Sequence, residues 1–266
     1  MTRWLAVPLA VLTCSALVLA CSTSPTGRST LKVFSNAQMS QMGITAFDEL
    51  KKQTPASRDA RAQAYVRCVA QAITREITTP GAPRSWEVVV FADDSANAFA
   101  LPGGKIGVHT GLFKVAKNQD QLATVIGHEV AHVLADHSNE RASTQMATSG
   151  VLEAMSALTG PASPAKSRTI AVLGAGAQVG LILPFSRSQE SEADVLGLDL
   201  MARAGFDPRQ GPALWENMAK LGGSPPEILS THPSSGTRIQ ALRERVKTAQ
   251  PIAEKARSAG KRPRCG

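Results

Sequence analysis

Aromatic residues are scarce in this chain and make up 4% of its 266 positions. Because large rings are so few, the core must consist mainly of Ala, Leu, Val and Ile, which suits close-packed helices better than a β-sandwich. The hydrophobic content of 43% is enough for one sizeable core at this length. We therefore expect a single, predominantly α-helical domain.

Beyond the first 20 residues, the sequence lacks any hydrophobic run of the ~20 residues that a membrane-spanning helix needs. The apolar run at 4–20 follows a basic residue and ends in a small residue before Cys21, as signal peptides do. The run Val-Leu-Ala-Cys at 18–21 resembles a bacterial lipobox, in which cleavage before the cysteine leaves a lipid on its thiol. We expect residues 1–20 to be a lipoprotein signal peptide; the alternatives are an ordinary signal peptide and an uncleaved anchor.

Cysteine is also scarce, with four in the chain. Cys14 leaves with the signal and Cys21 is expected to be lipidated, so that Cys68 and Cys265 remain. In an oxidising periplasm these two thiols can pair, but the sequence does not give the distance between their α-carbons. A disulfide and two unpaired thiols therefore stay equally open.

The formal net charge of +8 comes partly from a basic C-terminal tail at residues 251–266. No aromatic residue is interleaved with its basic ones, which argues against a base-stacking site for nucleic acid. We expect a solvated, poorly ordered end, with contact to anionic lipid or envelope polymer as the alternative. Residues 21–30, rich in Ser, Thr, Pro and Gly, are expected to be a flexible tether, and residues 31–250 the catalytic domain.

Hydrophobic periodicity predicts several helices and a small sheet. The apolar spacing predicts helices at 36–52, 57–77, 119–136, 189–204, 207–221 and 234–248. A strand is predicted at 86–91, and strands at 97–101 and 105–108 are predicted to form a hairpin about Pro102-Gly103-Gly104. Residues 138–168 are predicted to be a mobile lid or a plain surface connection. The apolar residues 170–185 are predicted to be a buried helix or a segment that touches the membrane.

The strongest chemical signal is the run His128-Glu129-Val130-Ala131-His132. On a helix, the two histidines are about 400° apart, which places them one turn along and only about 40° around the axis, so both can meet one ion. Glu129 is about 100° away, beside the metal, where its carboxylate can hold and deprotonate a water molecule. The run therefore predicts a metal site, and a histidine pair without an ion is the alternative.

A hydrolytic zinc site needs a third protein ligand and one open position. His137, nine residues after His128, would face away on a continuing helix, so we reject it unless that helix ends early. Glu190 is better placed, because it lies on a separate predicted helix that carries Asp194 one turn further on. We expect Glu190 to bind the metal and Asp194 to accept the free N–H of a ligating histidine, while Glu192 points elsewhere.

These motifs, together with Thr231-His232-Pro233-Ser234 ahead of Arg238, resemble the HtpX and CAAX-prenyl-endopeptidase family of gluzincin metallopeptidases. The resemblance covers roughly residues 31–246. It includes the run from Asn97 to Gly104, where the family places the substrate-facing edge of its sheet. The chain is similar to the soluble periplasmic lipoprotein branch, which includes LoiP-like and BepA-like proteins, and we expect it to be without the tetratricopeptide-repeat domain that BepA-like proteins add.

The resemblance implies an α+β gluzincin fold with a small sheet beside the helix that carries His128. It implies one Zn²⁺ per chain, and its ligands would be His128, His132 and Glu190. Glu129 would then be the general base and acid. An extended substrate would bind along the sheet edge through the backbone of Asn97, Ala98, Phe99 and Ala100.

The resemblance also places His232 near the metal. There, His232 would either help to stabilise an oxyanion or fill the open position of a resting site; a purely structural histidine is the alternative. Arg238 would orient an active-site carboxylate or merely cap a helix.

From these expectations we predict a zinc-dependent endopeptidase of the bacterial cell envelope that hydrolyses unfolded or misassembled envelope proteins. Ser22 stands where an Asp would favour retention in the inner membrane, so we expect a lipid anchor on the periplasmic face of the outer membrane. A tethered chaperone or assembly factor with a latent zinc site is the main alternative. A metal-free structural lipoprotein is a third.

Overall fold

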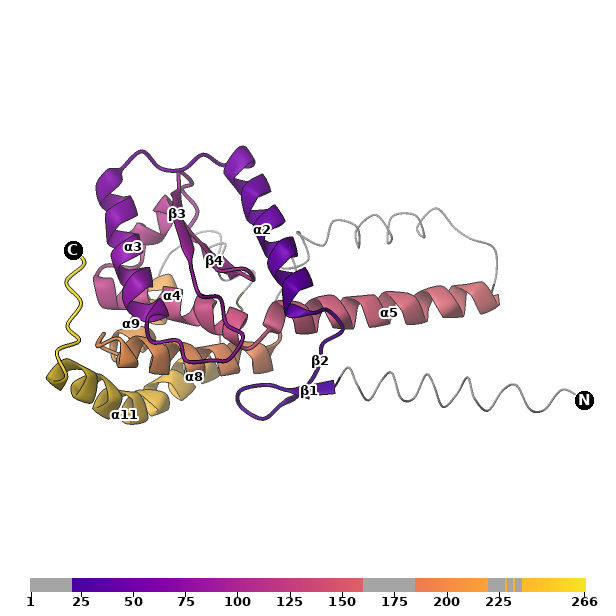
Figure 1. Cartoon of the computed structure of the whole chain (residues 1–266). Helices are drawn as coiled ribbons and strands as arrows, with labels where there is room; N and C mark the ends of the chain where they lie inside the picture. The colour runs from indigo at the N-terminus through magenta and orange to yellow at the C-terminus, as the bar shows by residue number, and fades with distance from the viewer. Residues whose placement is uncertain (1–20, 160–184, 220–227, 229–231, 233–235) are drawn as a thin grey trace, which may run out of the picture.

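Helices surround a small three-stranded sheet in this protein (Figure 1). The computed structural model describes residues 21–159, 185–219, 228, 232 and 236–266. The α-helices are α2 Asn36–Gln53, α3 Ala60–Thr74, α4 Gln119–Leu134, α5 His137–Thr159, α8 Arg187–Arg203, α9 Gln210–Ala219 and α11 Gly236–Ser258, with the 3-10 helix η1 at Thr110–Lys114. The strands are β1 Cys21–Thr23, β2 Ser29–Leu31, β3 Glu87–Phe91, β4 Ala98–Leu101 and β5 Lys105–His109. The predicted α+β class with predominant helix is confirmed.

The sheet has the order β3-β5-β4, with β5 parallel to β3 and antiparallel to β4. The predicted hairpin of β4 and β5 is thus confirmed. Gly103 and Gly104 have φ angles of 84° and 74° in its turn, a backbone conformation that L side chains rarely adopt. In Figure 1 the sheet lies between α2 and α3. Since β5 is central, β4 forms one edge of the sheet.

Helix α4 is the central element of the core. Asn118 caps its N-terminus by accepting hydrogen bonds from the backbone N–H groups of Asp120 and Gln121. Nearly all of its residues are buried, because α4 packs against β4 on one side and against α8 on the other. The histidine run is thus held on a helix that cannot shift without disturbing the core.

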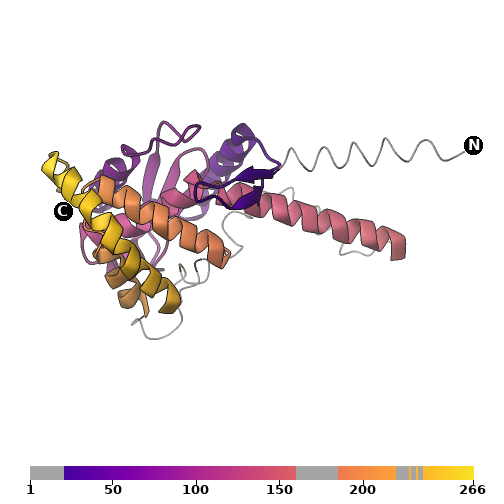
Figure 2. The same ribbon diagram turned by 90° about the horizontal axis from the view of Figure 1, so that it is seen from below.

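Two glycines allow α4 and α8 to approach closely. A Cβ on Gly127 would lie 2.8 Å from the carbonyl oxygen of Gly197, and a Cβ on Gly197 would lie 2.7 Å from the backbone nitrogen of His128. Neither distance leaves room for a side chain. Figure 2 shows α8 and α11 side by side on the underside of the molecule. The close approach of α4 and α8 brings the acidic residues at the start of α8 next to the histidines of α4.

Residues 138–159 of the predicted lid or surface connection are helical. Helix α5 runs from His137 to Thr159 and projects from the body (Figure 1). The serines and threonines that suggested a loop are accommodated in the helix, since the Thr144 hydroxyl donates to the carbonyl of Glu140 at 2.8 Å. The remainder of the predicted lid and most of the predicted buried helix, residues 160–184, lie outside the described residues.

The N-terminal hairpin, which we define as residues 21–31, takes the place of the predicted flexible tether. Its strands β1 and β2 pair antiparallel, with Cys21 opposite Leu31. Arg28 forms ion pairs with Glu140 of α5 at 3.0 Å and with Glu192 of α8 at 2.7 Å. The small polar residues are suited to the turn, but composition alone does not reveal the buried acidic partners that hold this segment.

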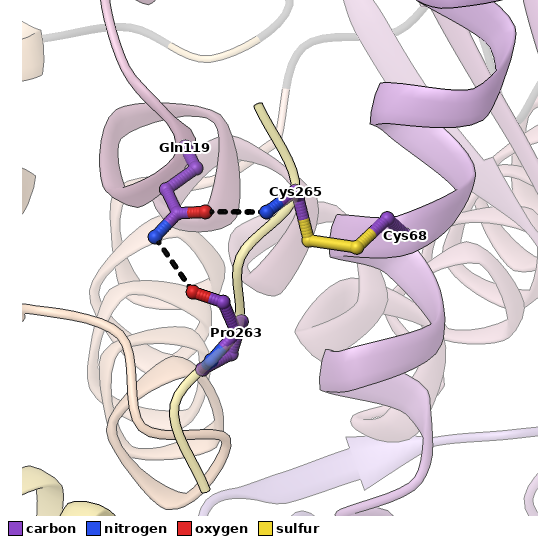
Figure 3. Close-up of a disulfide and its surroundings, with 4 residues drawn as sticks. All are labelled: Cys68, Gln119, Pro263 and Cys265. Carbon is purple, nitrogen blue, oxygen red and sulfur yellow. Dashed lines mark hydrogen bonds between the residues drawn. A yellow bond between two sulfur atoms is a disulfide. The ribbon is translucent and has the colours of Figure 1, made fainter.

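The C-terminal segment is also more ordered than predicted. Helix α11 continues through Pro251 to Ser258, across the predicted domain boundary at residue 250. A disulfide joins Cys68 on α3 to Cys265, and the Gln119 side chain bonds the backbone of Cys265 and Pro263 (Figure 3). A disulfide that closes so long a loop, 197 residues here, typically contributes about 2–4 kcal/mol to stability. The question that the sequence left open is answered in favour of pairing.

Among the described residues, no helix is long and apolar enough to cross a membrane.

Candidate metal centre

Four potential metal ligands meet in the core. His128 and His132 come from α4, Glu190 comes from the first turn of α8, and His232 approaches from the segment before α11. One ligand atom of each lies within 4.8 Å of the ligand atoms of the other three. All four residues are at most 4% exposed. The structure therefore brings together the three predicted ligands and adds the histidine expected nearby.

The spacing of these atoms suits a zinc ion. The Nε2 atoms of His128 and His132 are 3.1 Å apart, and His132 Nε2 is 3.4 Å from Glu190 Oε1. His232 Nδ1 lies 3.2 Å from His128 Nε2 and 2.8 Å from Glu190 Oε1. Nitrogen ligands at ~2.0–2.1 Å from a tetrahedral zinc are about 3.3 Å from one another. Three imidazoles and one carboxylate are also a donor set typical of zinc.

The electrostatics of the cluster favour a positive charge. Burial lowers the pKa of His128, but the adjacent Glu190 and Asp194 carboxylates outweigh burial and raise this pKa to about 9. Burial raises the pKa of Glu190, but the facing histidines outweigh it and hold the pKa far below its ordinary value. The carboxylates therefore stay ionised, and a cation held among them would replace the proton on the imidazoles.

Asp194 and Arg238 support the cluster from behind. Asp194 Oδ1 lies 3.1 Å from His128 Nδ1, the ring nitrogen that faces away from the other ligands. Arg238 contacts Asp194 through two nitrogens at 2.5 and 2.9 Å and Glu190 Oε2 at 2.5 Å. Its guanidinium also covers the Trp215 ring, 4.1 Å from the centroid. Arg238 thus contacts two carboxylates at the site, and it is buried.

Glu129 lies beside the four ligand atoms and is not one of them. Its Oε1 is 3.4 Å from His232 Nε2 and, among the described residues, accepts no hydrogen bond. Burial raises the pKa of Glu129, although His232 and His128 oppose the shift. A buried carboxylate oxygen without a donor is unfavourable unless a ligand or water satisfies it. Its position agrees with the geometry predicted from the helical spacing.

The predicted substrate edge is only partly available. Ala98, Phe99 and Ala100 do lie on β4 at the edge of the sheet. The Phe99 ring, however, packs with Phe47 and Phe91, and their ring centroids are 6.2 and 6.0 Å away. The carbonyl of Asn97 already accepts from the backbone N–H of His109 at 3.0 Å. The strand β4 is an edge strand, whereas the Phe99 side chain belongs to the core.

Several residues that contact the site carry no recognisable signal in the sequence. The Phe185 ring lies over His132, 3.8 Å between centroids, and the Arg141 guanidinium lies 3.5 Å from the Phe185 centroid. His137 contacts the Nδ1 side of His132. It is not one of the four residues of the ligand cluster, which agrees with the prediction that His137 is not a ligand. Glu192, expected to point elsewhere, is buried next to His137. Only tertiary packing unites these side chains.

Known proteins resemble this chain over most of its length. Residues 60–246 match peptidase family M48. The chain is 39% identical over 186 residues to the mitochondrial metalloendopeptidase OMA1 of Schizosaccharomyces pombe. This match covers 68% of this chain and 53% of that protein. It is 30% identical over 236 residues to the beta-barrel assembly-enhancing protease of Escherichia coli, covering 85% of this chain and 47% of that protein. The chain thus spans about half the length of these curated relatives.

Proposed function

The chain belongs to peptidase family M48, and from this membership we propose that it is a zinc-dependent endopeptidase of the bacterial cell envelope. Its substrates would be unfolded or misassembled envelope proteins. The observation that carries the proposal is the convergence of His128, His132 and Glu190 beside the buried carboxylate of Glu129. No other group of three or more potential ligands occurs in the part of the chain that the structure describes.

In this proposal His128, His132 and Glu190 hold one Zn²⁺. A bound Zn²⁺ would lower the pKa of its water molecule and polarise the carbonyl of the scissile peptide. Glu129 orients the attacking water, takes its proton on a carboxylate oxygen and delivers that proton to the leaving amine. Its raised pKa suits this role, because a group that accepts and returns a proton works best with a pKa near the ambient pH.

The residues behind the ligands have a positioning role in the same scheme. Asp194 Oδ1 lies 3.1 Å from His128 Nδ1, and in this proposal it accepts the N–H of that nitrogen, which would leave Nε2 free to bind the metal. Arg238 lowers the pKa of Asp194 and holds the carboxylates of both Asp194 and Glu190 in place. An extended substrate adds along β4 through backbone hydrogen bonds, which explains how one site can accept many unfolded sequences.

The envelope location rests on three supports. The lipobox-like run before Cys21 favours a lipid anchor on the periplasmic face of the outer membrane. The Cys68–Cys265 disulfide is typical of an oxidising compartment. The name of the Escherichia coli relative refers to β-barrel assembly, a process of the cell envelope, whereas the names of the OMA1 relatives place those proteins in mitochondria.

Metal removal tests the proposed activity. The purified full-length chain should cleave casein, an unfolded protein, and 1,10-phenanthroline should abolish this cleavage. Adding Zn²⁺ in excess should restore it, because the ligand cluster is preformed in the fold. Elemental analysis should find one zinc per chain. Cleavage that persists in the chelated, zinc-free protein would refute the metalloendopeptidase proposal.

His232 supports a second candidate function. Its Nδ1 atom lies among the ligand atoms, at the place where a catalytic zinc site keeps an open position. A site closed in this way would be latent, and the protein would then act chiefly as a tethered chaperone or assembly factor. The two functions are compatible if His232 moves aside when substrate binds.

Replacing His232 by Ala should distinguish these roles. If the imidazole blocks the fourth position for most of the time, its removal should raise kcat/KM for casein at saturating Zn²⁺ on the order of tenfold. Zinc affinity should fall, since one ligand is lost. Turnover and a zinc-chelator competition would be measured on the same preparation. A large drop in kcat at full zinc occupancy would instead assign His232 to stabilisation of the transition state.

A further inference from the structure

The back of the ligand His132 is occupied by a second histidine. His132 turns Nε2 toward the other ligands, and its Nδ1 lies 2.8 Å from Nδ1 of His137. His137 is fully buried at the start of α5. It can face His132 because α4 ends at Leu134 and Asp136, with a φ of 55°, redirects the chain before α5 begins. The early end of α4 therefore converts a residue that would have pointed away into a neighbour of the site.

The direction of the hydrogen bonds follows from the role of His132. If Nε2 is to bind a metal, the proton of the neutral ring must sit on Nδ1, which then donates to His137 Nδ1. His137 must in turn carry its proton on Nε2, which lies 3.2 Å from Glu192 Oε2. Glu192 Oε2 accepts the hydrogen bond from this Nε2–H group. The chain of contacts therefore fixes one tautomer for each ring.

Glu192 is held by the N-terminal hairpin. Its Oε1 accepts from the backbone N–H and the hydroxyl of Thr26 at 3.0 and 2.7 Å, and its Oε2 accepts from Arg28 Nε at 2.7 Å. Arg28 also reaches Glu140 of α5 with two nitrogens, at 3.1 and 3.0 Å. Glu192 therefore lies within hydrogen-bond distance of His137, Thr26 and Arg28 at once.

Arg28 acts on this chain of contacts through Glu192. Its Nη2 lies 3.3 Å from His137 Nε2, but both atoms carry protons in the tautomer derived above, so this contact is not a hydrogen bond. Thr26 and Arg28 together supply three donors to Glu192. The N-terminal hairpin is thereby linked to the metal ligand His132 through the side chains of Glu192 and His137.

We propose that His137 and Glu192 are positioning residues for His132, and that the N-terminal hairpin completes this support through Thr26 and Arg28. The proposal rests on the proposed function only in assigning His132 to the metal. Groups that orient a ligating histidine typically change metal affinity or activity 10–100-fold when removed. The hairpin is thus a working part of the metal site and not a passive tether.

Two substitutions of His137 test the first half of the proposal. His137→Phe keeps the ring shape and removes both nitrogens, so Zn²⁺ affinity, measured by competition with a chromogenic chelator, should fall about 10–100-fold. His137→Asn places an amide near the former Nδ1 and should recover part of that loss. The visible absorption of the Co²⁺-substituted protein should change in the Phe variant and move back toward wild type in the Asn variant. Circular dichroism of the metal-free proteins verifies folding.

Arg28 and Lys32 provide a matched pair for the second half. Lys32 joins the same end of the chain to Asp136 at 2.7 Å but contacts none of the residues behind His132. Arg28→Met should weaken Zn²⁺ binding at the lower end of that range, about tenfold, whereas Lys32→Met should leave it within about twofold. Equal losses of Zn²⁺ affinity in the two variants would show that the hairpin acts only by general stabilisation. That result would overturn the proposed support of His132 by the hairpin.

Failure of this inference and failure of the proposed function give different results. Unchanged zinc affinity and an unchanged Co²⁺ spectrum in His137→Phe overturn the inference, even if the wild-type chain cleaves casein. Weakened binding together with a changed Co²⁺ spectrum in that variant sustains the inference, even if wild-type protein cleaves nothing. Retention of the wild-type spectrum by the Phe variant alongside weaker binding would also overturn it, because a merely structural role predicts that combination.

Discussion

Replacing Glu129 by Gln is expected to lower kcat for casein hydrolysis by about 10²–10⁴-fold, the range typical of a lost general base. The amide has nearly the same size as the carboxylate but cannot accept the proton of the attacking water. Because no atom of Glu129 belongs to the four-ligand cluster, zinc affinity should stay within about twofold. Single-turnover cleavage and chelator competition on the same samples would measure the two effects.

A matched control for that experiment is Glu216→Gln on α9. Glu216 pairs with Arg243 at 2.6 Å, and both side chains are more than a third exposed, so the loss of this ion pair should leave turnover and zinc binding unchanged. Turnover by Glu129→Gln at a tenth or more of the wild-type rate would remove Glu129 from the proposed mechanism. If that variant is inactive but restores the phenotype of a deletion strain, the tethered chaperone becomes the better account.

Local sequence predicted the parts of the site that depend on helical spacing. The helix that carries His128 and His132 and the separate helix that carries Glu190 and Asp194 are both present in the fold. Their meeting was inferred from the chemistry of a zinc site and from the family resemblance, not from periodicity. A local signal for the meeting did exist: Gly127 and Gly197, each in the middle of a helix, mark the place where two backbones approach closely.

The residues behind the ligands could not be predicted, because their positions depend on where α4 stops. A continuing helix would have turned His137 away, and the single backbone conformation at Asp136 reverses that outcome. Residues 21–30 were predicted to be flexible from composition, although Thr26 and Arg28 have a buried acidic partner more than 160 positions away. Contacts between residues so distant in sequence arise from packing, which a single sequence does not display.

Arg238 combines buried charge with close contact to two carboxylates, and its replacement should have a large effect on stability. Arg238→Met keeps an unbranched, apolar stem but removes the guanidinium, which covers Trp215 and is the shared cation of Asp194 and Glu190. Removing one partner of a buried ion pair typically costs about 3–5 kcal/mol. Urea denaturation of the metal-free variant should show a loss of this size, which corresponds to a factor of roughly 10²–10⁴ in the folding equilibrium.

Bound Zn²⁺ should reduce that loss, since it supplies positive charge to the same carboxylates. Arg245→Met is the matched control: Arg245 also lies on α11 and pairs with Asp199 of α8, but this pair is partly exposed and should contribute no more than about 1 kcal/mol, with or without metal. If Arg238→Met destabilises the zinc-loaded and zinc-free proteins equally, the stabilising role of the guanidinium is its contact with the Trp215 ring. A smaller loss with zinc shows that the guanidinium and the metal stabilise the same negative charge.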